Sequence, residues 1–269
     1  MAAYYNEIDP YAAARLRQLI RQGFIPPGEV DERSILDVAA GDLAQFNQCH
    51  FFAGIGGWSY AIRLAGCLDE TPVWTGSCPC QPLSSAGRRQ GPADERHLWP
   101  AFYRLIAECR PATIFGEQVA SKDGREWLAG VRVDLEGLGY AIGAADLPAA
   151  CVGLPHQRQR LFWGANLYRA GASGGGRSDR TDQEATERAT PKTIKSRDRR
   201  FSELVTMGVA QWSPSYSEAR NMVDGIPYGL DQLRALGNAI VPEIGAEFIA
   251  AFYDSLMDVL VTPREHQRE

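Results

Sequence analysis

The chain has 269 residues, 45% of them hydrophobic and 23% charged, and a net charge of −5 at pH 7. This composition is typical of a globular protein with one sizeable core and excludes a disordered or collagen-like chain. No run of 18 apolar residues occurs, and the first residues lack a basic stretch followed by an apolar one, so we expect neither a transmembrane helix nor a signal peptide.

Helix and strand patterns alternate along much of the chain. Helical spacing or composition predicts helices over residues 11–22, 57–64, 99–109, 127–135 and 244–260. Short apolar runs predict strands over residues 49–53, 73–75, 113–115, 140–146 and 160–165. Strands that alternate with helices predict a doubly wound α/β fold, with a parallel sheet that helices cover on both faces.

Residues 170–200 break this alternation, because they are rich in Gly, Ser, Thr and charge and have no apolar periodicity. We expect a loop or a disordered stretch there. Residues 169–200 carry a net charge of +4, which leaves −9 on the remainder. Such a basic segment either contacts a polyanion or is a solvated linker, and the composition favours neither.

Cys80 follows a predicted strand and is flanked by Pro79 and Gln81. Without a secretion signal the six cysteines are expected to stay reduced, in an intracellular protein. Cys80 is then a candidate nucleophile, a small buried residue, or half of a Cys78-x-Cys80 zinc site. No second pair of ligands has metal spacing, so we predict no metal.

Three further features follow or open predicted strands. The Gly54-Ile55-Gly56-Gly57 turn lets a ligand approach the backbone closely, although such a turn also occurs without a ligand. Glu117 ends a strand at the edge where Cys80 emerges, and is either a proton-transfer group or a helix cap. Arg158 and Arg160 can grip a phosphate or a carbonyl oxygen, or simply face solvent.

Taken together, these residues form a series of blocks that resembles the DNA (cytosine-5) methyltransferase family, of phage or bacterial type, in motif content and order. The blocks are Phe52-Ala53-Gly54-Ile55-Gly56-Gly57, Gly76-Ser77-Cys78-Pro79-Cys80-Gln81-Pro82, Glu117-Gln118-Val119, Gln157-Arg158-Gln159-Arg160 and Gly237-Asn238-Ala239. The resemblance implies a Rossmann-like sheet and methyl transfer from S-adenosylmethionine to carbon 5 of cytosine in double-stranded DNA.

The resemblance also implies a role for each residue. Cys80 would add to carbon 6 of a flipped-out cytosine, and Glu117 would bind and help protonate ring nitrogen N3. Arg158 and Arg160 would hold the ring carbonyl and a nearby phosphate. Phe52 to Gly57 and Asn238 would lie at the cofactor. Covalent addition makes carbon 5 nucleophilic, and the base must leave the stack to reach a thiol.

The chain departs from the family pattern in residues and in spacing. His50, Gln118 and His156 stand where the family usually has Asp, Asn and Gln. Only about two dozen residues separate Gly54 from Cys80, where the family fits two further strands.

We interpret this spacing as an internal permutation in which those two strands come first. Residues 6–12 resemble the ribose-binding block and residues 30–35 the adenine-binding block. Glu7 would bind the ribose hydroxyls, Ile8 would pack on the adenine, and Asp31, less favoured Asp37, would meet its amino group. An alternative is that Glu7 and Asp31 are surface acids of a helical extension. In the permuted order the helix after Gly57 leads to the Cys80 strand, so the right-handed crossover rule predicts this helix on the face opposite its usual one.

We therefore expect a catalytic and cofactor-binding domain over residues 1–168, a reduced target-recognition region over 169–228, and a segment over 229–269 that packs back. The expected protein is cytoplasmic, binds no membrane or metal, and is most simply a monomer; a restriction-modification role is typical of the family. Two alternatives stay open. They are an enzyme that alkylates free cytosine nucleotides on the same fold, and a catalytically silent protein that binds DNA or cofactor.

Overall fold

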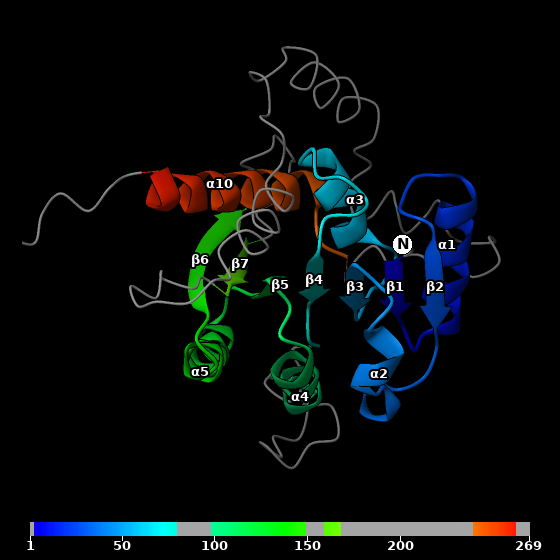
Figure 1. Ribbon diagram of the computed structural model, residues 1–269, viewed down its shortest axis with the longest axis horizontal. Helices are drawn as coiled ribbons and strands as arrows, with labels where there is room; N and C mark the ends of the chain where they lie inside the picture. Colours follow the sequence, from blue (N-terminus) through cyan, green and yellow to red (C-terminus); the bar gives the residue numbers. More distant parts are fainter. Residues whose placement is uncertain (1–2, 80–97, 149–158, 168–238, 262–269) are drawn as a thin grey trace, which may run out of the picture.

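The structure, a computed structural model, describes residues 3–79, 98–148, 159–167 and 239–261, and side chains up to residue 256 (Figure 1). Within these ranges seven strands form one sheet in the order β2-β1-β3-β4-β5-β7-β6. The strands are β1 (Ala3–Asn6), β2 (Gly28–Asp31), β3 (Gln48–Phe51), β4 (Val73–Gly76), β5 (Thr113–Val119), β6 (Ala141–Pro148) and β7 (Gln159–Asn166).

Neighbouring strands from β2 to β5 are parallel, whereas β7 is antiparallel to both β5 and β6. The mostly parallel sheet confirms the doubly wound α/β prediction. The reversed strand at one side was not predicted, because the direction of a strand depends on distant pairing and leaves no mark on local hydrophobic pattern.

The described helices are α1 (Pro10–Arg21), α2 (Ala40–Leu43), α3 (Gly57–Leu64), α4 (Trp99–Cys109), α5 (Lys122–Gly137) and α10 (Pro242–Val261), with a 3₁₀ turn, η1 (Ile35–Asp37). Five of the described helices agree closely with the sequence pattern, whereas the short α2 and η1 were not predicted. The predicted start of α1 is confirmed: Asp9 accepts a hydrogen bond from the amide of Ala12, and Pro10 occupies the first helical position.

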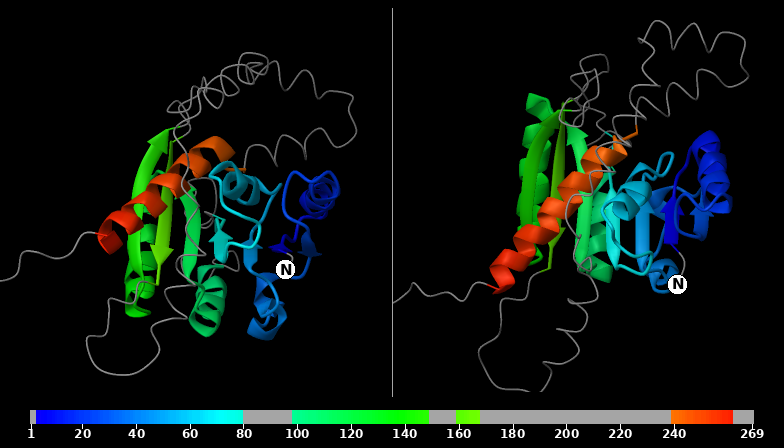
Figure 2. Two further views of the ribbon diagram at one scale, coloured as in Figure 1. Left: turned by 45° about the horizontal axis from the view of Figure 1, so that its top comes forward. Right: turned by 90° about the horizontal axis from the view of Figure 1, so that it is seen from above.

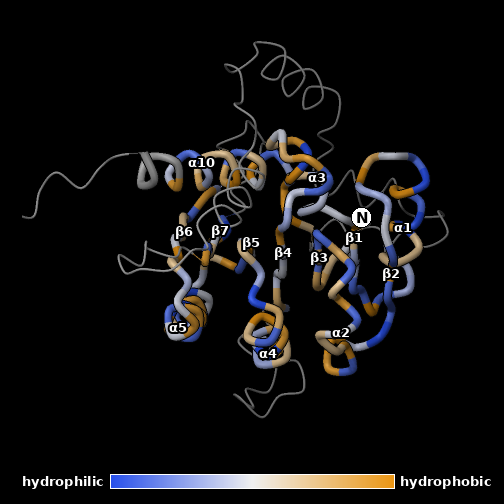
Figure 3. The backbone as a smooth tube through the Cα atoms, viewed as in Figure 1, coloured by the Kyte–Doolittle hydropathy of each residue, from blue (hydrophilic) through white to orange (hydrophobic). Residues whose placement is uncertain are grey.

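Helices cover both faces of the sheet (Figures 1 and 2). On one face α2, α4 and α5 pack over the alternate strand residues Cys49, Phe51, Trp74 and Ile114. On the other face α3 and α10 enclose Val73, Phe115 and Phe162. Each helix carries both hydrophobic and hydrophilic residues (Figure 3), whereas every residue of β1, β3 and β4 is buried, as strands covered on both faces require.

Helix α1 lies on the same face as α3. Tyr5 of β1 packs with Leu16 of α1, and its hydroxyl lies 3.1 Å from the Ser59 hydroxyl oxygen of α3. The prediction that α3 crosses to the opposite face is therefore wrong. In the family order, the chain crosses the sheet in the same direction after the glycine-turn strand and after the ribose-block strand. The helices that follow these two strands, which correspond to α3 and α1, therefore share a face. Helix α3 keeps that usual face.

This placement gives the β3-α3-β4 connection an unusual hand. The steps β3 to β4 and β4 to β5 run in the same direction across the sheet, but α3 and α4 lie on opposite faces. The two connections therefore have opposite hands. The connections through α1, α2 and α4 all have the same hand. Because ~98% of connections between parallel strands are right-handed, we take this shared hand as right-handed. The connection through α3 is therefore left-handed.

Packing against α10 explains why the crossover rule is overridden. Trp58, Ala61 and Ile62 of α3 are buried in one cluster with Ile244 and Ile249 of α10. On the other face α3 would lose this cover, and burying each large apolar side chain contributes roughly 1.5–3 kcal/mol.

His50 of β3, where the family usually has Asp, is a buried neutral group. Its ring stacks on Tyr5 with centroids 5.0 Å apart, and its two nitrogens lie 2.9 Å from Thr75 Oγ1 and 3.2 Å from Gln48 Oε1. Burial lowers the pKa of His50 to about 3. The histidine therefore joins β1, β3 and β4 under the glycine turn without carrying charge at neutral pH.

Candidate functional site

The glycine turn connects the carboxyl end of β3 to α3. Phe52, Gly54 and Gly56 have φ angles of 52°, 54° and 81°, and Gly56 is the N-cap of α3. A left-handed conformation is easy for the glycines but costly for Phe52. The turn thus places the N-terminus of α3 at the carboxyl edge of the sheet, where open α/β sheets bind ligands.

Glu7, which follows β1, contacts this turn directly. The amide of Gly54 donates to Glu7 Oε2 at 2.6 Å, and the amide of Asp9 donates to Oε1 at 2.9 Å. Burial raises the pKa of Glu7, while these backbone hydrogen bonds oppose the rise. The contact between Glu7 and Gly54 is the one that the permutation requires. Beside it the side chain of Ile8 is 66% exposed.

Asp31, at the end of β2, is engaged within the protein. The Tyr4 hydroxyl donates to Oδ2 at 2.7 Å, and the Arg33 guanidinium pairs with the same oxygen at 2.7 Å. The backbone amide of Arg33 donates to Oδ1 at 2.9 Å. Burial alone would raise the pKa of Asp31, but the hydrogen bonds from Arg33 and Tyr4 outweigh it and lower the pKa. Asp37 is exposed on η1.

Glu117 and Arg160 meet at the same edge of the sheet. Arg160 Nε lies 2.6 Å from Glu117 Oε1, and the two side chains are 21% and 11% exposed. The pair forms because β7 runs antiparallel to β5, with Glu117 opposite Phe162 and Val119 opposite Arg160. The structure therefore brings together two site residues that lie 43 positions apart.

Cys80, Arg158 and Asn238 lie outside the described residues, and so do residues 168–238, which include the whole predicted target-recognition region, residues 169–228. The described chain ends at Pro79 on that side, in the segment that follows β4. The roles of Cys80, Arg158 and Asn238 therefore stay predictions.

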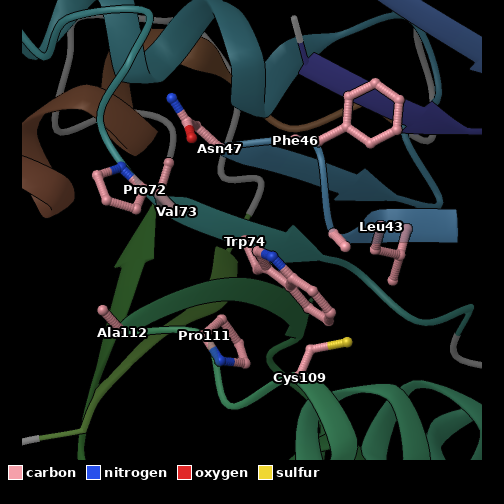
Figure 4. A pocket seen from close by; sticks show the side chains of 10 residues that line it. Leu43, Phe46, Asn47, Pro72, Val73, Trp74, Cys109, Pro111 and Ala112 are labelled. Carbon is pink, nitrogen blue, oxygen red and sulfur yellow. The ribbon is translucent and has the colours of Figure 1, made fainter. Parts of the chain in front are cut away.

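A cavity of about 230 Å³ lies at the opposite edge of the sheet (Figure 4). It is lined at the amino ends of β4 and β5 by Val73, Trp74, Pro111 and Ala112, together with Cys109 of α4. None of the predicted site residues lines it. A ligand site in this fold is expected at the carboxyl ends of the strands, so the cavity is not assigned to the predicted chemistry.

The described residues contain no group of three or more His, Cys, Asp or Glu side chains placed to hold a metal ion. Among the same residues, no helix has the length and apolar character needed to cross a membrane.

Comparison with known families decides the assignment. The model of the C-5 cytosine-specific DNA methylase family matches residues 68–222, more than half of the chain. The chain belongs to this family. The matched stretch begins after the glycine turn, so the turn and the residues before it lie outside the family match.

Two curated type II methyltransferases are similar to this methylase-family chain over part of their length. M.AplI of Arthrospira platensis is 35% identical over 96 residues, which are 35% of this chain and 28% of that protein. M.HhaI of Haemophilus parahaemolyticus is 33% identical over 163 residues, 59% of this chain and 40% of that protein. The chain thus spans less than half the length of both relatives.

The fold agrees with a solved structure of Entamoeba histolytica methyltransferase EhMeth. The TM-score is 0.53 at 14% identity, covering 94% of this chain and 90% of that one. At this identity the likeness concerns the fold alone, and it confirms the Rossmann-like sheet predicted from the motifs.

Two contacts near the site were not predicted. The Trp58 indole donates to Ser77 Oγ at 2.9 Å, and the Gln118 amide donates to the carbonyl of Cys78 at 3.4 Å. Gln118 was noted as a departure from the family pattern, but nothing in local sequence indicated its partner.

Proposed function

We propose that the protein transfers a methyl group to carbon 5 of cytosine in double-stranded DNA, through a covalent adduct between Cys80 and a flipped-out base. The observation that carries this proposal is the Glu117–Arg160 ion pair, at the same sheet edge as the glycine turn. The carboxyl edge of the sheet is thereby divided into two parts with different proposed functions. We name Glu117 and Arg160 the base side, and Glu7, Ile8 and Gly54 the cofactor side.

On the base side, the contact of Arg160 Nε with Glu117 Oε1 orients the Glu117 carboxyl. A carboxyl held in this way can hydrogen bond to ring nitrogen N3 and share a proton with it, which eases attack at carbon 6. The Arg160 guanidinium has five donors, so it can hold Glu117 and still contact a carbonyl or phosphate oxygen. Cys80, as thiolate, would supply the attacking electron pair and leave when the carbon 5 proton is removed.

The cofactor side fits S-adenosylmethionine by the chemistry of its groups. The Glu7 carboxylate accepts the N–H groups of Gly54 and Asp9 on different oxygens, and because a carboxylate has about four acceptor sites, it can also accept a ribose hydroxyl. Exposed Ile8 offers an apolar surface for adenine. When bound, the cofactor would supply the methyl group. Asp31 fits less well, because each of its oxygens already accepts at least two hydrogen bonds: Oδ2 from the Tyr4 hydroxyl and Arg33 Nη2, and Oδ1 from the amide and Nε of Arg33.

We further propose that the chain is permuted, with the ribose and adenine strands β1 and β2 placed before the glycine-turn strand β3. Three observations support it: the strand order β2-β1-β3-β4, the bond between Glu7 and Gly54, and a family match that starts only at residue 68. Moving residues 3–45 to follow residue 70, with short linkers, should leave a folded chain with unchanged cofactor affinity. Loss of folding would contradict the permutation.

The function is tested by incubating the protein with S-adenosylmethionine and mixed-sequence duplex DNA, then digesting the DNA and measuring 5-methylcytosine by mass spectrometry. We expect 5-methylcytosine with the wild-type chain and none with Cys80→Ala. Product formed only from free cytosine nucleotides would replace the proposal with the small-substrate enzyme. No product with either substrate, alongside measurable cofactor binding, would favour the silent binding protein.

A further inference from the structure

The segment that leads to Cys80 is held from both faces of the sheet. The β4–β5 ladder ends with Thr75 opposite Phe115, so the backbone beyond Gly76 has no ladder pairing with β5. Ser77 and Cys78 follow there, three and two residues before the proposed nucleophile. Side chains from two other elements bind them.

Trp58 of α3 holds Ser77 on one face. Its indole N–H donates to Ser77 Oγ at 2.9 Å, and the side chain is only 6% exposed. The ring is fixed by stacking on Phe115, with centroids 6.1 Å apart, and by edge contact with Phe162 at 5.8 Å. Because aromatic neighbours fix the ring plane, the N–H has a defined direction.

Gln118 of β5 holds Cys78 on the other face. Its side chain is 2% exposed, and its amide nitrogen donates to the Cys78 carbonyl at 3.4 Å, while its amide oxygen accepts from the backbone N–H of Val119 at 2.9 Å. The Cys78 side chain itself is buried in the cluster that contains Trp74 and Phe102. The two ends of the amide are therefore both engaged, which fixes its orientation.

We propose that Trp58 and Gln118 are positioning residues, which clamp Ser77 and Cys78 and so set the backbone that presents Cys80 to the base. The inference rests on the proposed function. We name these four residues the Ser77–Cys78 clamp. Trp58 is the second residue of α3, whose N-cap is Gly56 of the glycine turn, so the clamp also joins the cofactor side to the nucleophile segment.

The sharpest variant is Trp58→Phe, which keeps an aromatic ring and removes only the indole N–H. Trp99→Phe is the matched control, because Trp99 is also 6% exposed and donates through its indole, at 2.7 Å, to Asp134 on the other face. Ser77→Ala removes the acceptor, Ser77→Thr retains it, and Gln118→Leu removes the other arm.

Two measurements separate positioning from stability. The first is amide hydrogen exchange of peptides that contain residues 76–79, which requires neither DNA nor cofactor. The second is kcat and the KM for S-adenosylmethionine in methyl transfer to duplex DNA. Trp58→Phe and Ser77→Ala should each speed exchange and lower kcat about fivefold, the usual size of one lost hydrogen bond, with KM unchanged.

Ser77→Thr should keep the wild-type kcat, and Trp99→Phe should match the wild type. A chain that combines Trp58→Phe with Ser77→Ala should be no slower than either single variant, because both remove the same hydrogen bond. Wild-type transfer with an unchanged kcat in Trp58→Phe and Gln118→Leu would overturn the clamp. A wild-type chain that protects residues 76–79 but transfers no methyl group would instead overturn the proposed function.

Discussion

The two ends of the sheet edge hold their carboxyl groups by different means. On the cofactor side, Glu7 is held by the backbone amides of Gly54 and Asp9. On the base side, Glu117 is held by the guanidinium of Arg160 at 2.6 Å. Glu7 is thus bound by backbone groups, and Glu117 by a long side chain from a neighbouring strand.

This difference has a consequence for function. Backbone amides cannot be removed by a side-chain change and barely move, which suits a site that must match the fixed shape of a cofactor. An ion pair between side chains can share its donors with an incoming group, which suits a site where charge and protons shift during reaction. Substitutions on the cofactor side should therefore alter affinity, and those on the base side the rate.

Cys80→Ala should give the largest effect. Transfer to duplex DNA should be abolished, because no other group on the base side can form the adduct with carbon 6. Cofactor affinity, measured by isothermal titration calorimetry, should stay within about twofold of wild type, since we assign Cys80 to bond formation with the base and not to cofactor binding. Residual methylation by this variant would break the proposed mechanism.

Glu117→Gln should come next, with kcat lower by about 10²–10⁴-fold. The amide keeps the shape of the side chain but can neither pair with Arg160 as a carboxylate nor transfer a proton. Cofactor affinity should be unchanged. Single-turnover kinetics provides the measurement, and a variant that loses cofactor affinity but not rate would reverse the assignment of the two sides.

Glu7→Gln should weaken cofactor binding about tenfold, with a much smaller effect on kcat at saturating cofactor. The neutral amide loses charge-assisted acceptance from the Gly54 and Asp9 amides and from a ribose hydroxyl. Titration of the cofactor by calorimetry checks this. An affinity equal to wild type would remove Glu7 from the cofactor side.

Asp31→Asn should act on stability instead. Since the pKa of Asp31 is lowered in the folded protein, its ionised form stabilises the fold above the unfolded pKa of about 4, and that contribution is lost as pH falls through the folded pKa. Because Arg33 is half-exposed, solvent screens part of the interaction, and we expect about 1–2 kcal/mol at pH 7.

Urea unfolding of both proteins between pH 7 and pH 3 measures this difference, which should shrink as the pH falls. Cofactor affinity should be close to wild type. A large loss of affinity with little loss of stability would support the contact with adenine that the sequence motif predicts.

Much of the fold could be predicted because its signals are local. Asp9 and Pro10 predict the start of α1. Gly54 and Gly56 predict the turn before α3, because glycine adopts their positive φ angles easily. The bond between Glu7 and Gly54 was anticipated only through the unusual spacing of the motifs.

Other features depend on contacts between distant residues, so the sequence pattern did not contain them. The face of α3 follows from its burial against α10, nearly 200 residues away. The Glu117–Arg160 pair needs the antiparallel register of β5 and β7. Asp31 matched a binding motif, but its partner Tyr4 lies on a neighbouring strand, so the local sequence did not indicate this hydrogen bond.

The most direct measurement is the intact mass of the protein after incubation with S-adenosylmethionine and duplex DNA that contains 5-fluorocytosine. Fluorine cannot leave carbon 5 as a proton does, so the reaction should stop at the covalent stage. We predict an adduct that maps to Cys80 and carries one methyl group, absent in Cys80→Ala. An unmodified wild-type protein that nevertheless methylates ordinary duplex DNA would contradict covalent catalysis by Cys80.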